Sequence, residues 1–193
     1  MERAEGGDLG RWRRACLRDL DGCVLELGAG SGANISHYSD RVEGLTMVEP
    51  LAGFRKMLEA RCESVGRTDV TIVEGVAESL SVPDHSLDAI VTTLVLCSVS
   101  DPERVLQECY RALRPGGRLA VIEHVRSGHF GVRCLQHFAN PFQKLFAGGC
   151  RTTRDTLRYL KVAGFDCSGL QASVMRPAPL HVRDCVYGVA LKP

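Results

Sequence analysis

The stretch VLELGAGSGANI, residues 24–35, joins an apolar run to three glycines at alternate positions, Gly28, Gly30 and Gly32. Glycine loses much backbone entropy on folding and adds nothing to a core, so three together indicate a place where bare main chain is needed. A carboxylate, Glu26, stands just before them. Taken alone, the loop is either a tight strand-to-helix turn or a ligand-binding loop that exposes its backbone N–H groups.

The spacing of further residues limits which class of ligand the loop can bind. Glu49 lies 21 positions after Gly28, at the end of a second apolar run, where a carboxylate can accept hydrogen bonds from both hydroxyls of a ribose. Ala77 and Glu78 follow a third run, at the height of an adenine edge. The Gly-x-Gly-x-Gly pattern differs from the dinucleotide fingerprint, and no Gly-Lys-Ser/Thr follows it, which excludes a Walker loop.

Alternating strand and helix patterns must position these residues. We expect helices over Leu9 to Leu20 with Asp8 as the cap, Asn34 to Ser39, Ala52 to Ser64, Pro102 to Leu113 and Arg154 to Ala163. We expect strands over Cys23 to Leu27, Leu45 to Glu49, Val70 to Val73, Leu87 to Leu96, Arg118 to Val125, Asp166 to Met175 and Asp184 to Leu191. The alternation predicts an α/β, three-layer fold with a mostly parallel sheet, whose ligands lie beyond the carboxyl ends of the strands.

Composition limits the possible partners. The chain has 193 residues, 45% hydrophobic and 24% charged, which predicts a single domain over residues 1–193. A net charge of +1 indicates no nucleic-acid partner, and no apolar run approaches the ~20 residues of a transmembrane segment. The nine cysteines form no Cys-x-x-Cys pair and no zinc-like spacing, so we predict free thiols, no metal site and a cytoplasmic location.

The motifs together resemble the class I S-adenosylmethionine-dependent methyltransferases. ELGAGSG is similar to their first motif, VEP to their acidic second-strand end, and RALRPGG to their turn before the fifth strand. The resemblance covers roughly Cys23 to Val125. It implies an enzyme with S-adenosyl-L-methionine as cofactor and a Rossmann-like, seven-stranded sheet whose last strand is antiparallel.

A narrower resemblance concerns the acceptor. TLVLCSVSDPERVLQECYRALRPGG, EHV and GGCRTTRDTLRYLKVAGF resemble the alkyl-thiol S-methyltransferase family of microsomes and its bacterial relatives. This implies a small-molecule methyl acceptor, in the first place an alkyl thiol. The animal members begin with a hydrophobic anchor, whereas the first residues here are polar, so we do not carry over a microsomal location.

The class resemblance also assigns cofactor contacts. It implies that the three loop glycines approach the methionine part, that Glu26 holds its ammonium group, and that Glu49 binds the ribose. Glu78 either meets the adenine amine or faces solvent, and Thr93 is either a ligand contact or a core residue. The full predicted set is Glu26, Gly28, Ala29, Gly30, Gly32, Glu49, Pro50, Ala77, Glu78, Thr93 and Leu94. We place cofactor binding within about 20–125, and the acceptor site and closing strands within about 126–193.

The acceptor chemistry needs little acid–base assistance. A thiol with a pKa of ~8.5 is partly ionised near neutral pH, so a general base is optional. His124 is the best candidate base, with Glu123 next, although His124 can equally be structural. We expect the segments after the fourth and fifth strands to build the acceptor pocket, with Cys97, Ser98, His137, Phe138, Phe142 and Phe146 as lining residues. The aromatic stretch, which is broken at Pro141, is either an apolar lid or a plain packing helix. We interpret Cys150 as structural.

Other function classes stay open. The acceptor can instead be a carbon, nitrogen or oxygen atom of a quinone, phospholipid or secondary metabolite. A non-catalytic S-adenosylmethionine-binding protein would carry the same loop. An NAD-dependent oxidoreductase is disfavoured by the glycine spacing and by the lack of a Tyr-x-x-x-Lys hydride site. The sequence makes no prediction of oligomeric state.

Overall fold

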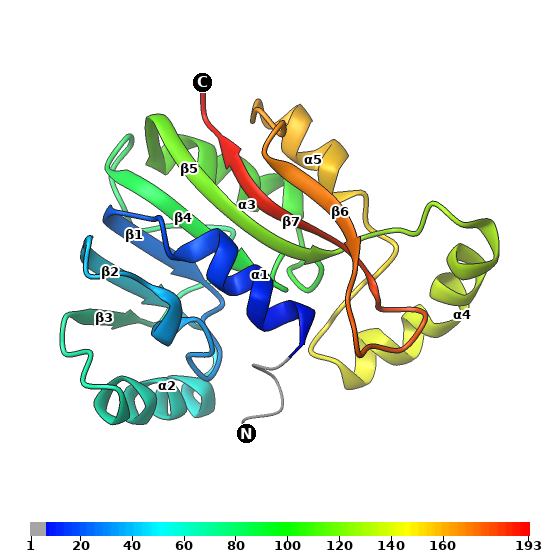
Figure 1. Ribbon diagram of the computed structural model, residues 1–193, viewed down its shortest axis with the longest axis horizontal. Helices are drawn as coiled ribbons and strands as arrows, with labels where there is room; N and C mark the ends of the chain where they lie inside the picture. The colour runs from blue at the N-terminus through cyan, green and yellow to red at the C-terminus, as the bar shows by residue number, and fades with distance from the viewer. Residues whose placement is uncertain (1–6) are drawn as a thin grey trace.

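One twisted sheet runs through the protein (Figure 1). The computed structural model describes residues 7–193, so the polar start of the chain, Met1–Gly6, lies outside the described residues. The strands stand in the order β3-β2-β1-β4-β5-β7-β6. Their bounds are β1 Gly22–Leu27, β2 Val42–Val48, β3 Val70–Val73, β4 Leu87–Thr93, β5 Leu113–His124, β6 Leu170–Val174 and β7 Asp184–Leu191. Strands β1 to β5 pair in parallel and β7 runs antiparallel to both neighbours, which confirms the predicted fold.

Helices cover both faces of this sheet. Figure 1 shows α1 in front of the strands and α3 and α5 behind them. The bounds are α1 Asp8–Leu17, α2 Ala52–Ser64, α3 Pro102–Ala112, α4 Phe130–Phe146 and α5 Thr156–Val162, with a short 3-10 helix, η2, at Ile35–His37. The result is the expected three-layer arrangement.

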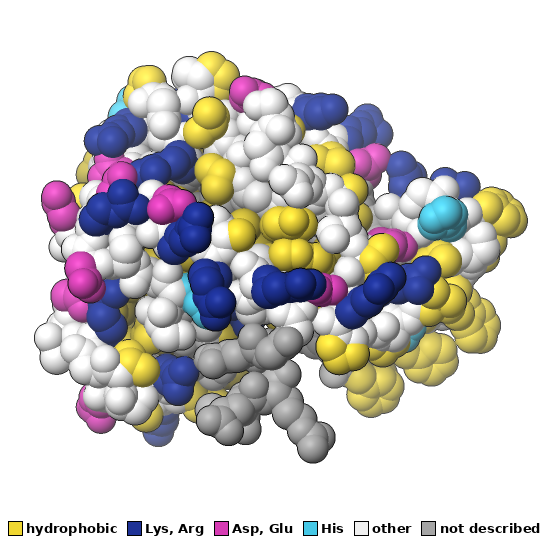
Figure 2. Space-filling model, in the orientation of Figure 1, with side chains coloured by type: hydrophobic (Ala, Val, Ile, Leu, Met, Phe, Trp, Pro, Cys, Tyr) yellow, Lys and Arg dark blue, Asp and Glu magenta, His cyan; other side chains and the backbone are white. Residues whose placement is uncertain are grey.

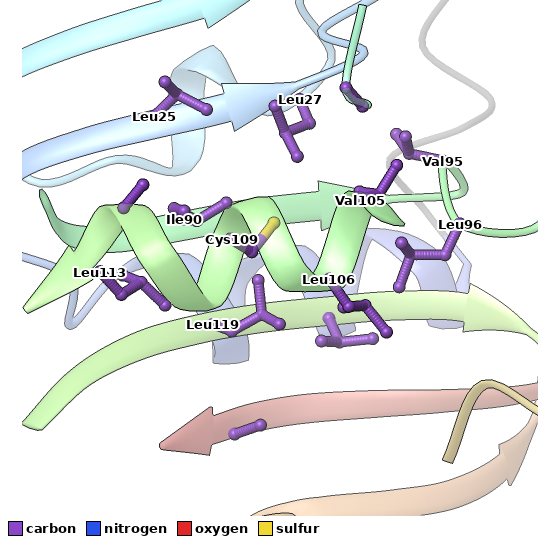
Figure 3. Packing of buried hydrophobic residues seen from close by; sticks show 14 of the residues in the cluster. Leu25, Leu27, Ile90, Val95, Leu96, Val105, Leu106, Cys109, Leu113 and Leu119 are labelled. Carbon is purple, nitrogen blue, oxygen red and sulfur yellow. The ribbon is translucent and has the colours of Figure 1, made fainter. Parts of the chain in front are cut away.

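The strand alternation divides the core into two clusters. In β1, Val24 packs with the buried residues of α1 and α2, whereas Leu25 packs with those of α3 and α5. The central strand β4 repeats this pattern, since Ala89 joins the first cluster and Ile90 the second. Figure 3 shows the second cluster, in which α3 runs along β4, with β1 on one side and β5 on the other. Because both faces are covered, the central strands β1 and β4 are mostly apolar, and their polar exceptions include Glu26 and Thr93 near the carboxyl ends.

Local sequence accounts for the start of α3. Asp101 caps the helix, and its side chain accepts a hydrogen bond from the N–H of Arg104 at 3.0 Å. Pro102 occupies the first turn, where its missing N–H costs nothing. The helix ends at Ala112, and β5 begins at once, so the expected turn at RPGG, residues 114–117, lies within the first part of this long strand.

The sheet brings one set of strand ends together. Leu27, the last residue of β1, pairs with Val48 on one side and with Thr92 on the other, while Thr93 pairs with Ile122 of β5. The carboxyl ends of β1, β2, β4 and β5 therefore lie along a single edge. In doubly wound sheets this edge is where ligands bind.

Several expected elements differ from the structure in their bounds or caps. The helix predicted over 34–39 is only the three-residue η2, because glycine-loop geometry extends up to it. The strand expected to reach Leu96 ends at Thr93, since Leu94 adopts a left-handed backbone with φ of 59°. Gly7, not Asp8, caps α1; the Asp8 carboxylate instead accepts a hydrogen bond from the N–H of Arg176 at 2.7 Å.

Helix α4 departs furthest from the expectation. It runs without a break through Pro141, and the hydrogen bond that the proline cannot donate would have gone to the carbonyl of residue 137, an exposed position. Its apolar face points outward, and Figure 2 shows the resulting yellow patch over this helix. The exposed side chains are Phe130, Leu135, Phe138, Phe142, Leu145 and Phe146. Within residues 7–193 no helix is both long and apolar enough to span a bilayer.

Candidate functional site

Three cavities lie along the carboxyl edge of the sheet. The first, which we call the glycine cavity, has a volume of about 400 Å³. It gathers seven of the eleven predicted cofactor residues, namely Gly28, Gly30, Glu49, Pro50, Ala77, Glu78 and Leu94. These residues come from the ends of β1 and β2 and from the loops after β3 and β4, as parallel topology requires.

Glu49 connects the ends of β1 and β2. Its side chain is buried, its Oε2 accepts a hydrogen bond from the N–H of Gly30 at 2.9 Å, and its Oε1 accepts one from the N–H of Leu51 at 3.0 Å. An ionised carboxylate has about four acceptor positions, so two remain for a ligand. The carboxylate is therefore both fixed in place and able to bind a diol.

Each of the three loop positions requires glycine for a different physical reason. Gly28 and Gly30 adopt φ of 59° and 56°, a region that L side chains rarely enter. A Cβ on Gly28 would lie 2.7 Å from Val95, whereas one on Gly30 would meet no neighbour closer than 4.0 Å and would enter the open cavity. Gly32 does not line the glycine cavity. A Cβ on Gly32 would lie 2.8 Å from Leu58, so this glycine allows α2 to pack closely against the loop.

Glu26 lies in a smaller adjoining cavity of about 250 Å³, which we call the carboxylate cavity. It is fully buried and accepts hydrogen bonds from Asn34 Nδ2 at 2.9 Å and from the Tyr38 hydroxyl at 2.6 Å. Burial raises the pKa of Glu26 to about 7, although both hydrogen bonds oppose that rise. Thr93 lines the same cavity and its Oγ1 accepts from Asn34 Nδ2 at 3.1 Å. Ala29 lines it as well.

The carboxylate of Glu78 forms a hydrogen bond within the protein. Its Oε1 accepts a hydrogen bond from the N–H of Ser100 at 3.0 Å, and its backbone carbonyl accepts one from Arg104 Nε at 2.9 Å. The side chain is half-buried, so it neither faces solvent freely nor points only at the cavity. Ala77 beside it is buried on the cavity wall.

A third cavity of about 510 Å³, the cysteine cavity, lies beyond the ends of β4 and β5. Leu94 and Ser98 line both this cavity and the glycine cavity, so the two spaces meet at these residues. The remaining wall comes from Gly7, Leu9, Cys97, His124, Gln143, Ala147, Cys150, Met175, Arg176, Pro177, Ala178, Pro179 and Val182. Most of this wall is apolar.

Cys97, His124 and Cys150 form a buried cluster on that wall, called here the cysteine cluster. His124 Nδ1 lies 3.4 Å from Cys150 Sγ and 3.8 Å from Cys97 Sγ, and the two sulfur atoms are 3.6 Å apart. The hydrogen bond with Cys150, together with burial, raises the pKa of the Cys97 thiol well above its usual value. Cys97 and His124 are 27 positions apart in the sequence, and His124 and Cys150 are 26 apart, so the three residues form no short metal-binding motif.

Glu123 and Arg154 hold the segment that carries Cys97, and their positioning roles were missed from the sequence. The buried Glu123 carboxylate accepts hydrogen bonds from the N–H groups of residues 95, 96 and 97 at 2.8, 2.9 and 3.1 Å. Burial raises the pKa of Glu123, and these three bonds oppose the rise. The Arg154 guanidinium donates to the carbonyls of Leu96 and of Val99. A carboxylate used this way does not serve as a free base.

Helix α4 contributes less to the cavity than the aromatic pattern suggested. Cys97 and Ser98 line the cysteine cavity as expected, but its lining includes none of the α4 residues predicted for it. Those residues are His137, Phe138, Phe142 and Phe146, and the three phenylalanines are between 62% and 79% exposed. Gln136 explains the orientation, because its side chain bonds the N–H of Ser127 and the carbonyl of Val125 and so turns the polar face inward.

Comparison with known proteins decides the family. Residues 25–121, about half of the chain, match the Methyltransferase domain family (Methyltransf_11). This chain belongs to that family.

The similarities of this methyltransferase to individual proteins extend over most of the chain and agree with the family. It is 36% identical over 187 residues to thiol S-methyltransferase TMT1B of Rattus norvegicus, covering 91% of this chain and 75% of the relative. It is 35% identical over 179 residues to thiol S-methyltransferase TMT1A of Homo sapiens, covering 88% and 70%. A putative methyltransferase structure from Bacillus halodurans superposes with a TM-score of 0.76 at 18% identity, over 96% of this chain and 99% of that one, which shows the shared fold.

The protein is thus an S-adenosylmethionine-dependent methyltransferase. Its residues fit that cofactor. Glu49 offers two unused acceptor positions beside the cavity, where a ribose requires them. The space that a Cβ on Gly30 would enter is left open for the cofactor. When bound, the cofactor supplies an electrophilic methyl group on a positively charged sulfur.

Proposed function

We propose that this methyltransferase transfers the methyl group of S-adenosylmethionine to the sulfur of an alkyl thiol. The observation that carries the proposal is the likeness to thiol S-methyltransferases over 91% of the chain. A match of that length must include most of the segments after residue 121 that wall the cysteine cavity. The similarity therefore extends to the acceptor side of the protein as well as to the cofactor side.

We assign the cofactor to the glycine and carboxylate cavities. Glu49 would bind the ribose hydroxyls, and the wall at Ala77 would receive the adenine. Gly28 and Gly30 would allow the methionine part to approach the backbone, with Glu26 near its ammonium group. The reactive methyl would then point past Leu94 into the cysteine cavity, because this residue lines both spaces. Pro50 and Glu78 complete the wall.

An apolar thiol suits the cysteine cavity. The mostly apolar wall removes water from the acceptor, and a soft nucleophile needs alignment more than a dedicated base. Nδ1 of His124, the base candidate, faces two cysteine sulfurs. We therefore assign His124 a role in organising the cavity rather than a free general-base role.

A methylation assay tests the acceptor. The purified protein is incubated with S-adenosylmethionine and a panel of alkyl thiols, phenols, amines and quinols, and products are identified by mass spectrometry. We expect thiols to react with the highest kcat/KM. Glu49→Ala serves as the background control, since spontaneous methylation of a thiol would persist in it. Turnover confined to another acceptor class overturns the thiol proposal, and cofactor binding without any turnover supports a non-catalytic binder.

A further inference from the structure

The cysteine cluster has the dimensions of a metal site. Its three donor atoms, Cys97 Sγ, His124 Nδ1 and Cys150 Sγ, lie within 4.8 Å of one another, and all three residues are buried. Bond lengths of ~2.3 Å to sulfur and ~2.0 Å to nitrogen at tetrahedral angles place two sulfurs ~3.8 Å apart and a sulfur and a nitrogen ~3.5 Å apart around zinc. The observed separations are 3.6 Å between the sulfurs and 3.4 and 3.8 Å from nitrogen to sulfur.

We propose that Cys97, His124 and Cys150 bind Zn²⁺ and leave its fourth position open to the sulfur of the acceptor. Two thiolates and one imidazole form a donor set that prefers zinc over harder cations, and three protein ligands with one open position are typical of catalytic zinc sites. The part concerning the acceptor sulfur rests on the proposed thiol methyltransferase function. The zinc site itself does not.

The place of the cluster in the molecule supports an open fourth position. All three side chains line the cysteine cavity rather than a closed interior. Ser98, the neighbour of Cys97, also lines the glycine cavity, where the cofactor is assigned. A sulfur atom bound to the cation would therefore lie next to the boundary across which the methyl group must pass.

The ligands are held by the surrounding backbone. The N–H of Arg151, next to Cys150, donates to the carbonyl of Cys97 at 2.7 Å, which joins the two cysteine segments directly. The Glu123 carboxylate accepts a hydrogen bond from the N–H of Cys97 at 3.1 Å. Such outer contacts keep metal ligands in place before the cation arrives.

Charge and tautomer agree with the assignment. Two thiolates carry two negative charges, which Zn²⁺ neutralises, so the buried site as a whole holds no net charge. His124 Nε2 is buried without a hydrogen-bond partner among the described residues. The neutral tautomer with its proton on Nε2 leaves the Nδ1 lone pair, which faces both sulfurs, free for the cation.

The chemical step balances without an oxidant. Binding of Zn²⁺ releases the protons of both cysteine thiols, and binding of the acceptor thiol releases a third proton to solvent. The acceptor sulfur then forms a bond to the methyl carbon while the bond from that carbon to the sulfonium sulfur breaks. The electron pair of the broken bond stays on the leaving sulfur, so the products are a thioether and S-adenosylhomocysteine.

Zinc titration tests the site directly. The full chain is purified under reducing conditions, stripped with a chelator and titrated with Zn²⁺ against a chromophoric competitor. We expect one tightly bound Zn²⁺ per chain. Cys97→Ser and Cys150→Ser should each weaken binding at least about tenfold, since each removes a ligand. Cys167→Ser is the matched control, because this partly buried thiol lies outside the cluster, and it should bind zinc as the parent does.

Two results overturn the zinc site. One is zinc binding by the double variant, Cys97→Ser with Cys150→Ser, that equals binding by the parent. The other is a Cys97–Cys150 disulfide that persists in the reducing buffer, detected by thiol counting and peptide mass spectrometry. Binding of S-adenosylhomocysteine to each variant shows that it has folded, because the assigned cofactor cavities contain neither cysteine.

Cobalt substitution tests the open position. Co²⁺ in the site should give thiolate charge-transfer bands, and an alkyl thiol added with unreactive S-adenosylhomocysteine should change them. An unchanged spectrum with a thiol that the enzyme methylates overturns the acceptor role while the proposed function stands. If zinc binds but no thiol is methylated, the proposed function fails and the zinc site stands.

Discussion

Oε2 of Glu123 accepts a hydrogen bond from the backbone N–H of Cys97 at 3.1 Å, across 26 positions of sequence. Together with the bonds to residues 95 and 96, it makes a carboxylate at the end of β5 the anchor of the turn that follows β4. That turn begins at Leu94, whose left-handed backbone is strained for a residue other than glycine. The strained turn persists because a buried side chain from the neighbouring strand satisfies its N–H groups.

Replacing this anchor should damage both fold and turnover. In Glu123→Gln one oxygen becomes an NH₂ group that cannot accept from the turn, so we expect a loss of roughly 1–3 kcal/mol in the free energy of unfolding. The loosened turn should also lower kcat and weaken S-adenosylhomocysteine binding, because Leu94 and Val95 of this turn line the glycine cavity. Urea unfolding, steady-state kinetics and calorimetry measure the three quantities. Unchanged stability and kcat would show that the turn keeps its shape without the carboxylate.

Glu49 should control cofactor affinity. Glu49→Ala removes charge-assisted hydrogen bonds to the ribose and should weaken S-adenosylmethionine binding by about 1.5–3 kcal/mol in titration calorimetry. Glu74→Gln is the matched control, because this exposed carboxylate near the same strand ends pairs with Arg55 outside the cavity. Equal affinities for both variants would remove Glu49 from the ribose site.

Two glycine substitutions separate backbone strain from cavity filling. Gly30 and Gly66 both have positive φ, and a Cβ on either meets nothing within van der Waals overlap, but only Gly30 lines the glycine cavity. Each change to Ala should cost a similar amount of stability, roughly 1 kcal/mol. Only Gly30→Ala should also weaken cofactor binding, by tenfold or more in the same calorimetric assay. A similar effect of Gly66→Ala on binding would contradict the cavity assignment.

The raised pKa of Glu26, about 7 against an ordinary value of 4.5, predicts a pH dependence. Between these values the folded state holds a proton that the unfolded state has lost, so stability falls as pH rises through this window. The loss amounts to at most about 3 kcal/mol and is complete above the folded pKa. Glu26→Gln should lack this decline in urea unfolding measured from about pH 5 to about pH 8. Parallel pH profiles for parent and variant would assign the decline to other groups.

Binding should depend on the same carboxyl group. The ammonium group of the cofactor favours ionised Glu26, so its binding should release a proton near neutral pH and strengthen as pH rises. Calorimetry in buffers of different ionisation enthalpy measures that proton. Glu26→Gln should release none, and proton release that survives in the variant would place the ammonium group elsewhere.

The cofactor side was predictable because its determinants are local. The glycine loop follows β1 directly, Glu49 ends the next strand, and parallel topology then brings them to one edge without further information. The seven-stranded, mostly parallel sheet and its antiparallel last strand followed from the family resemblance and are confirmed. The ends of strands were harder to predict: the strand expected to reach Leu96 ends at Thr93, because Leu94 adopts a left-handed backbone.

The acceptor side was hidden because its contacts are long-range. Nothing in the sequence near Arg154 indicates that its guanidinium reaches carbonyls more than 50 positions away. The aromatic pattern of α4 predicts that one face of the helix is apolar, but it does not predict whether that face points toward the cavity or toward the surface. Its direction depends on Gln136, which looks like an ordinary surface residue in the sequence.

The cysteine cavity is walled by chain segments that are far apart, and two of them, residues 143–150 and 175–182, lie outside the part shared with the wider family. On the proposed assignment of the two cavities, donor recognition and acceptor choice therefore depend largely on different portions of the polypeptide. A library that diversifies these two segments but keeps Gly148 and Cys150 should redirect the methyl group to new recipients while the affinity for the nucleoside stays the same.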